Sequence, residues 1–346
     1  MNLKSVFAQL QGKRVMVIGD IIVDEYIWGD VNRISPEAPV PVFETCTETT
    51  GCGGAANVAQ NVASLGAYAS LFGVIGDDRA GQKLVQMATE MNLGIDGVCV
   101  DSQRPTSTKT RVIARAASSI STERTWEPGQ HLLRIDRESK QEIPTRLRER
   151  LLVEVVSQLP ASDAVLFSDY DKGVVNAQLI KEVVKQAQAY DIPIIVDPKR
   201  DNFWHYEGVT AVTPNHKEAG VAVREEITDM RQLVAVGERI LNRLSLKALL
   251  ITRDAEGMSL FQRGADGNLQ VKHLPSRSNT VTDVTGAGDT VVAVFTLALA
   301  AGAEFQSAAV LSSLAGGIVV GKMGCATATS EELLQAIETA QIAPAY

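Results

Sequence analysis

The chain has 346 residues, of which 45% are hydrophobic and 21% charged, as expected for a globular enzyme with one large core. Its formal net charge is −8 and it has no run of Lys and Arg, which argues against nucleic acid and anionic membranes as partners. The four cysteines form no CxxC pair and have no histidine at metal-ligand spacing, so a zinc site and a disulfide framework are disfavoured and a cytoplasmic location is expected.

Apolar, β-rich runs alternate with segments of helical periodicity. In chain order these are strand 14–19, helix 55–65, strand 69–76, helices 81–91 and 144–158, strand 164–168, helix 177–190, strands 193–197 and 210–213, helix 230–244, strands 248–252 and 258–262, and helices 287–301, 306–322 and 331–339. Several of these strands are apolar throughout, as in a sheet that is covered on both faces. The alternation therefore predicts an α/β fold with a mostly parallel central sheet.

Two segments, 24–50 and 98–136, break this alternation because they are polar, β-prone and contain Pro. We expect them to form a small extra sheet over the strand ends, a lid that excludes water from a site. The alternative is two long surface loops. Within the second segment, 116–129 is expected to be a mobile loop.

Polar residues follow several predicted strands. Ligands of parallel sheets bind outside the carboxyl ends of the strands. This rule places one set of residues near a common rim: Asp20, Asp169, Asp197, Asn215 and Thr252.

The segment DVTGAGDT (283–290) is a glycine-rich turn that opens an apolar helix. Backbone N–H groups of Gly286, Ala287, Gly288 and Asp289, together with the helix dipole, make a site for a phosphate. Asp289 lies at this positive end, where it can stay ionised and accept a proton from a hydroxyl. An anion site beside a base is what phosphoryl transfer to an alcohol needs. The alternative is an ordinary helix start with Asp as its cap.

A second glycine cluster, GCGGAAN (51–57), opens the helix at 55–65. Gly53 and Gly54 let a ligand approach the backbone, and Asn57 offers a donor and an acceptor to a hydroxyl. The cluster also fits the G-x-G-x-x-A fingerprint of dinucleotide binding, so an NAD-dependent oxidoreductase is an alternative. Against it, polar residues 47–51 separate the cluster from the preceding apolar run, and 283–289 would have no role.

Charged side chains elsewhere suggest a substrate with hydroxyl and phosphate groups. Asp20 and Asp24 can accept hydrogen bonds from sugar hydroxyls, although both also suit a turn. Lys109 and Arg111 alternate along a predicted lid strand, so both face one side and can bind a phosphate; the alternative is an exposed edge strand.

Asn215 and Glu218 share a face if a helix begins there, and an amide with a carboxylate suits hydrated Mg²⁺ and its phosphates. The alternative is a helix start with an N-terminal acid. Further candidates near the rim are Arg134, Asp136, Lys172 and Lys199.

The two glycine motifs, with TPNHKE (213–218) between them, resemble the signatures of the PfkB (ribokinase-like) carbohydrate kinases over nearly the whole chain. The resemblance implies a ribokinase-like three-layer α/β/α fold with a small β lid, and ATP and Mg²⁺ as cofactors. We expect a single kinase domain over 1–346, with lid segments at about 24–50 and 98–136.

Further motifs at 19–24, 33–42, 108–111, 168–173 and 197–199 resemble the D-glycero-β-D-manno-heptose 7-phosphate kinases of this family. This resemblance implies ATP-dependent phosphorylation of the anomeric 1-hydroxyl to the 1,7-bisphosphate, in the route to ADP-heptose for the lipopolysaccharide core. A PfkB-type kinase for another sugar and a catalytically inactive sugar-binding protein are the alternatives. Many relatives add a C-terminal nucleotidyltransferase domain with an HxGH motif; this sequence has no HxGH, so we expect no such domain.

The resemblance also implies roles for individual residues. Asp289 is the base, and the backbone of 286–289 holds the phosphoryl group. The residues implied along ATP are Lys199, Thr252, Arg253 and Gly257, with Asn215 and Glu218 organising Mg²⁺ through water. The residues implied around the sugar hydroxyls are Asp20, Asp24, Gly53, Gly54 and Asn57. Those implied at the 7-phosphate are Lys109, Arg111 and Lys172, with Arg134, Asp136 and Asp169 as further substrate-binding candidates.

Asp283 and Thr285 correspond to a monovalent-cation (K⁺) site of some relatives. Relatives pair through their lids, so a homodimer is expected.

Overall fold

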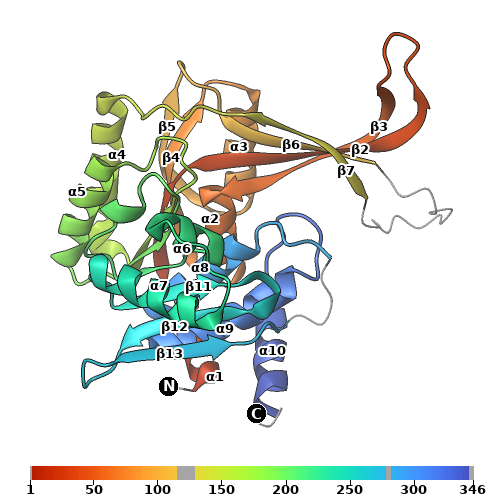
Figure 1. Cartoon of the computed structure of the whole chain (residues 1–346). Helices are drawn as coiled ribbons and strands as arrows, with labels where there is room; N and C mark the ends of the chain where they lie inside the picture. The colour runs from red at the N-terminus through yellow and green to blue at the C-terminus, as the bar shows by residue number, and fades with distance from the viewer. Residues whose placement is uncertain (1, 115–128, 278–281, 343–346) are drawn as a thin grey trace.

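The computed structural model describes residues 2–114, 129–277 and 282–342, so the predicted loop at 116–129 lies outside the described residues except for Gly129. Within them, the main sheet has the strand order β13-β12-β11-β10-β9-β8-β1-β4-β5 (Figure 1). Its strands are β1 (Arg14–Gly19), β4 (Tyr68–Gly76), β5 (Gly94–Asp101), β8 (Ala164–Ser168), β9 (Ile194–Asp197), β10 (Ala211–Val212), β11 (Ala248–Thr252), β12 (Met258–Arg263) and β13 (Leu269–Leu274). The strands from β5 to β11 are parallel, and β12 and β13 are antiparallel.

Helices cover both faces of this sheet, because alternate strand residues point to opposite sides and both sets are apolar. Val17 and Leu71 lie in one core cluster, whereas Ile18 and Phe72 lie in the other. The first cluster is covered by α1 (Leu3–Ala8), α2 (Ala55–Ser64), α3 (Arg79–Glu90), α8 (Ala287–Ala300), α9 (Phe305–Val319) and α10 (Ser330–Ile342). The second is covered by α4 (Thr145–Gln158), α5 (Ala177–Gln188), α6 (His216–Val223) and α7 (Met230–Arg243). The predicted three-layer α/β/α arrangement is confirmed.

Every predicted strand and helix is present, with ends shifted by a few residues. Besides β5, whose last residues were assigned to the lid, three elements were not predicted: α1, α6 and β13. The first two span six and eight residues, too short for a clear helical period. The third is an antiparallel edge strand whose residues are mostly exposed, so it lacks the apolar run of its neighbours.

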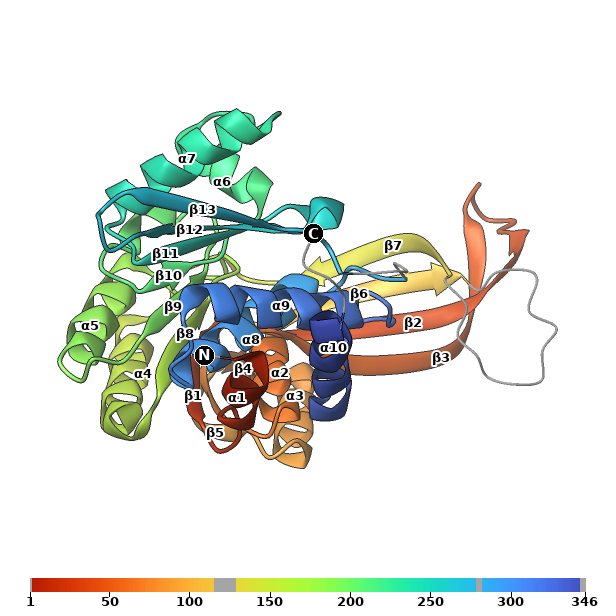
Figure 2. The same cartoon turned by 90° about the horizontal axis from the view of Figure 1, so that it is seen from below.

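A small sheet projects from the body in the order β3-β2-β6-β7 (Figure 2). Its strands are β2 (Ile21–Ile34), β3 (Pro41–Gly54), β6 (Ser107–Ala114) and β7 (Gln130–Arg137). The surface-loop alternative for 24–50 is therefore wrong. Residues 98–101, which were assigned to the lid, instead end the edge strand β5 of the main sheet.

The small sheet is tied directly to the main one. β2 starts at Ile21, only one residue after β1 ends, and its first half is buried while its last residues are exposed. The start of β2 therefore lies at the carboxyl end of β1, where ligands of parallel sheets bind. The four cysteines, Cys46, Cys52, Cys99 and Cys325, are free thiols. Across the described ranges, no helix combines the length and apolar character needed to span a bilayer.

Candidate active site

The N-terminal tip of α8 carries Asp289 in a buried position, 4% exposed. Gly286 caps the helix with a φ of 76°, a left-handed conformation that favours glycine, and a Cβ there would lie 2.8 Å from Nδ2 of Asn57. A Cβ on Gly288 would meet no atom within 4 Å. Glycine is thus needed at position 286 for the conformation of the turn, whereas at position 288 it leaves space beside the helix tip.

Within α8 itself, the backbone at this tip offers two donors, and the N–H of the cap residue Gly286 also makes no hydrogen bond with the described residues. Ala287 donates its N–H to the carbonyl of Val284 (3.2 Å), so its predicted place in the anion site is not available. The N–H groups of Gly288 and Asp289 make no hydrogen bond within the described residues. Both belong to the first helical turn, where such groups favour an anion.

Both carboxylate oxygens of Asp289 accept hydrogen bonds from side chains. The Tyr170 hydroxyl donates to Oδ1 and the Asn57 amide donates to Oδ2, each over 2.7 Å. Burial raises the pKa of Asp289 above its usual value, the two hydrogen bonds oppose that rise, and the nearby Asp24 adds to it. A carboxylate with a raised pKa that is fixed by two donors is suited to act as a general base.

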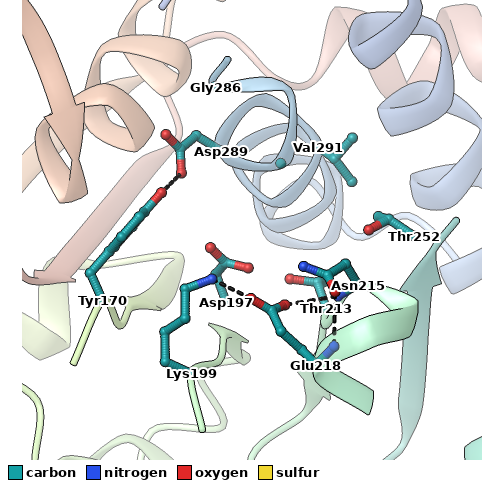
Figure 3. A pocket seen from close by; sticks show the side chains of 11 residues that line it. Tyr170, Asp197, Lys199, Thr213, Asn215, Glu218, Thr252, Gly286, Asp289 and Val291 are labelled. Atoms are coloured by element: carbon teal, nitrogen blue, oxygen red, sulfur yellow. Dashed lines mark hydrogen bonds and ion pairs between the residues drawn. The ribbon is translucent and has the colours of Figure 1, made fainter. Parts of the chain in front are cut away.

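Asp289 opens onto a pocket of about 130 Å³, the α8 pocket (Figure 3). Its lining residues are Tyr170, Asp197, Lys199, Thr213, Asn215, Glu218, Thr252, Gly286, Gly288, Asp289 and Val291. Seven of them, from Tyr170 to Thr252, end or follow β8, β9, β10 and β11 at their carboxyl ends, as the topology rule predicts. The structure thus brings together seven predicted site residues: Lys199, Asn215, Glu218, Thr252, Gly286, Gly288 and Asp289.

Opposite the α8 tip, Asn215 and Glu218 form a complete capping box at the start of α6. The Asn215 side chain accepts from the Glu218 N–H, and the Glu218 carboxylate accepts from the Asn215 N–H, both over 2.9 Å. Glu218 also pairs with the Lys199 ammonium. Burial works against the charged lysine, but Asp197 and Glu218 outweigh it and raise the pKa of Lys199 to about 12. The result is a fixed group of charges facing the two amides of α8.

Arg253 and Gly257, predicted to lie along ATP, do not line the α8 pocket. Arg253 pairs with Glu256 at 2.9 Å and lines a separate hollow with His216 and Met230. Gly257 has a φ of 88°, and a Cβ there would collide with the carbonyl oxygen of Leu274. Both residues therefore shape the turn between β11 and β12.

On the small sheet, Asp24 is held from two sides. Its Oδ1 lies 2.5 Å from Nη1 of Arg111, and the Cys325 thiol donates to its Oδ2 over 3.1 Å. A Cβ on Gly53 would lie 2.6 Å from the same Oδ2, so glycine is needed for Asp24 to approach. Arg111, predicted to bind a phosphate, is instead paired and packs over the ring of Tyr26.

Lys109 lies on the same face of β6 as Arg111, as predicted, but makes no hydrogen bond or ion pair with the described residues. Burial lowers its pKa, and the nearby Lys172 lowers it further. By contrast, Lys172 pairs with Glu138 at 2.7 Å, and Arg134 pairs with Asp136 at 2.9 Å on the exposed strand β7. Among these cations, Lys109 is available for an anionic ligand.

Asp20 and Asp169, predicted to bind substrate, lie behind the α8 pocket. The Asp20 carboxylate is 1% exposed and accepts the N–H groups of Tyr170 (2.8 Å), Lys172 (3.1 Å) and Val174 (3.1 Å). Burial, with a smaller contribution from Asp169, raises the pKa of Asp20 to about 6. The fully buried Asp169 accepts the hydroxyl of Tyr206 at 2.6 Å. These carboxylates fix the loop after β8 instead of facing a ligand.

Asp283 and Thr285 are in contact at the turn before α8. Asp283 Oδ1 accepts the Thr285 N–H (2.9 Å) and hydroxyl (2.7 Å), and Oδ2 accepts the Gly324 N–H (2.9 Å). Burial would raise the pKa of Asp283, but these hydrogen bonds outweigh it and the pKa is lowered. The carboxylate is therefore charged and ties two loops together.

Tyr170, Asp197, Thr213 and Cys325 were not predicted as site residues. The first three follow or end strands at the rim, and this position in the sequence is the signal that could have identified them. Cys325 carries no such signal, because it lies in a loop between α9 and α10.

The second glycine cluster also settles the oxidoreductase alternative. Residues 51–54 end β3, which pairs antiparallel with β2 in the small sheet. A dinucleotide fingerprint instead follows a parallel strand of the main sheet. That alternative is therefore wrong.

A model of the pfkB family of carbohydrate kinases matches residues 13–332. Bifunctional protein HldE of Geobacter metallireducens is 42% identical over 333 residues, which are 96% of this chain and 64% of that protein. The HldE protein of Geobacter sulfurreducens is 41% identical with the same shares. The chain thus spans just under two thirds of the length of these curated relatives.

Solved structures of similar fold include phosphofructokinase-2 of Escherichia coli in complex with substrates and products, with a TM-score of 0.74, 17% identity, and coverage of 95% of this chain and 99% of that one. Ribokinase of Arabidopsis thaliana complexed with ribose and ATP has a TM-score of 0.71 and 18% identity, with the same coverage. These neighbours show that the fold is ribokinase-like. With the family model matching almost from end to end, the chain belongs to the PfkB family of carbohydrate kinases.

Proposed function

We propose that the chain is an ATP-dependent kinase for the anomeric 1-hydroxyl of D-glycero-β-D-manno-heptose 7-phosphate, and that it yields the 1,7-bisphosphate for the ADP-heptose route of lipopolysaccharide core synthesis. One observation carries the proposal: a buried carboxylate lies beside two unpaired amides at the wall of a polar pocket. Family membership supports a sugar as acceptor. The heptose motifs and the identity to HldE proteins support this particular sugar.

In the proposed reaction the 1-hydroxyl oxygen attacks the γ-phosphorus of ATP. The bond between that phosphorus and the bridging oxygen breaks and ADP leaves, while the hydroxyl proton passes to Asp289. The N–H groups of Gly288 and Asp289 stabilise the charge on the transferred group. Gly288 leaves the space that a phosphate needs beside them.

Lys199, Asn215 and Glu218 are proposed to bind the phosphates of ATP and, through water, Mg²⁺, which neutralises phosphate charge when bound. The donor set fits, because the pocket combines a cation with carboxylate and amide oxygens. Thr252 lines the same pocket and is proposed to contact ATP. The K⁺ site remains a proposal for Asp283 and Thr285, which offer carboxylate and hydroxyl oxygens.

On the sugar side, Asn57 and Asp24 are proposed to bind the hydroxyls, with Gly53 and Gly54 allowing close approach. Lys109 is proposed to bind the 7-phosphate, because it is a partly buried cation that makes no hydrogen bond or ion pair with the described residues and has only the Tyr170 ring beside it. Phosphate replaces the water that burial removes from the ammonium.

The small sheet is proposed to serve as the lid and as the surface through which two copies pair. It exposes apolar side chains on two of its strands, β2 and β7: Val31 (39%), Ile34 (63%), Leu133 (58%) and Ile135 (51%). We keep the cytoplasm as the proposed compartment, since ATP is available there and the four cysteines are thiols.

A panel of sugar phosphates, with ADP release as the readout, tests the proposal. Heptose 7-phosphate should have the highest kcat/KM, and its product should carry phosphates at C1 and C7. Preference for a different sugar would favour the alternative of another PfkB-type kinase. If no sugar stimulates ADP release, the proposed activity is wrong.

A further inference from the structure

Tyr170 lies where the two halves of the site meet. It follows β8 and points its hydroxyl at Oδ1 of Asp289, as Figure 3 shows. The ammonium of Lys109, from the small sheet, lies 5.2 Å from its ring centre, and that of Lys199, from the loop after β9, lies 5.3 Å away. The ring thus lies close to both the proposed sugar-phosphate cation and the proposed ATP cation.

The backbone of Tyr170 is fixed. Its N–H donates to the Asp20 carboxylate, which also holds Lys172 and Val174, and the next residue, Asp171, has a φ of 54°. Burial and the adjacent Asp289 raise the pKa of the Tyr170 phenol, so the hydroxyl stays protonated and remains a donor. Only rotation of the side chain can take it away from Asp289.

The hydrogen bond occupies the oxygen that the acceptor needs. Oδ2 of Asp289 is taken by Asn57, which lies in the buried helix α2 and is itself bonded to Asn61. Tyr170 lines the α8 pocket and Asn57 does not, so a hydroxyl that enters from the pocket approaches Asp289 on the Oδ1 side, where it would donate as the phenol does. The Tyr170 hydroxyl stands in for the acceptor hydroxyl.

We propose that Tyr170 is a positioning residue that holds the acceptor's place while no sugar is bound, keeps water away from Asp289, and so suppresses sugar-independent hydrolysis of ATP. This inference rests on the proposed kinase function. In the suppressed reaction a water oxygen attacks the γ-phosphorus, the bond to ADP breaks, and Asp289 takes the proton of the water. The sugar displaces the phenol and receives the phosphoryl group instead.

The test is Tyr170→Phe in the full chain, with ADP release from Mg-ATP measured without sugar. Removing the hydroxyl opens room for water at Oδ1, so sugar-independent hydrolysis should rise by about tenfold or more. The matched control is Tyr206→Phe, which also removes a tyrosine donor to a buried carboxylate, Asp169, but outside the α8 pocket. Hydrolysis by the control should equal that of the wild type.

A second readout separates positioning from a loss of structure. Without the phenol, Asp289 loses a donor that favours its charged form, so its pKa rises and the acid limb of the kcat/KM profile with sugar moves to higher pH. Tyr206→Phe should leave that limb in place. Unchanged hydrolysis in Tyr170→Phe would overturn the inference; if that variant does not fold, Tyr170→Met makes the same measurement. Because the hydrolysis assay contains no sugar, failure of the heptose panel alone would reject the proposed substrate and leave this result interpretable.

Discussion

The two sides of the site are built differently. On the phosphoryl side, the tip of α8 faces Asn215 and Glu218, whose polar atoms are fixed by a helix cap and by Lys199. On the small-sheet side, Asp24 is held by partners from two other segments, and Lys109 has no hydrogen-bond or ion-pair partner among the described residues, only the ring of Tyr170 beside it. The difference suggests that the phosphoryl side is organised before substrates bind, whereas the sugar side is completed by the substrate's own charge.

The largest effect is expected for Asp289→Asn. Loss of the base should lower kcat by at least about 10²-fold, while ATP and sugar still bind. Isothermal titration of the variant with each substrate measures binding, and ADP release measures turnover. Retention of most of the wild-type kcat would show that the phosphoryl side does not depend on a base.

Gly288→Ala and Gly286→Ala distinguish space for a ligand from the needs of the turn. The methyl group at Gly288 meets no protein atom, so the variant should keep its melting temperature. It fills the space that a phosphate needs beside the N–H donors, so kcat/KM for ATP should fall by about tenfold or more, the scale of a weakened donor contact to the transferred group. Gly286→Ala should in addition lower the free energy of unfolding by about 1–2 kcal/mol, because alanine disfavours the left-handed φ at this position. Equal melting temperatures for the two variants would contradict this distinction.

Lys109→Met tests the unpaired cation. Loss of a charge-assisted hydrogen bond should raise KM for the phosphorylated sugar by about tenfold, with little change for the unphosphorylated analogue. Arg134→Met is the control, because Arg134 is already paired with Asp136. If both sugars are affected equally, Lys109 does not recognise the phosphate.

The smallest effect is expected at Cys325. Burial raises the pKa of its thiol, so it remains a donor to Asp24. Cys325→Ala removes the donor and should raise the sugar KM by about threefold, a small effect because a thiol is a weak hydrogen-bond donor. Cys325→Ser keeps a donor and should stay close to the wild type. The opposite order would show that thiol size matters more than its hydrogen bond.

Sequence reasoning reached the parts of the site that depend on local pattern. The turn at Gly286, the helix start at Asn215 and the alternation of Lys109 with Arg111 are set by neighbours in the chain. It could not assign partners, because these come from distant segments: Tyr170 is 119 positions from Asp289, and Arg111 is 87 positions from Asp24. For the same reason Asp20 resembled a ligand-binding carboxylate, although it accepts hydrogen bonds from three backbone N–H groups.

One consequence follows from the continuity of β2. Its fourteen residues run from Ile21, beside the base of the pocket, to the exposed Ile34, a length of about 45 Å at the usual rise per residue. Asp24, the residue proposed to contact the sugar, is the fourth residue of this strand, close to its buried end. The pairing with β3 is irregular between Trp28 and Gly29 and again between Val31 and Arg33, and the strand can bend at these two positions. A displacement of the exposed end of β2 is therefore transmitted to Asp24 unless the strand bends at these positions.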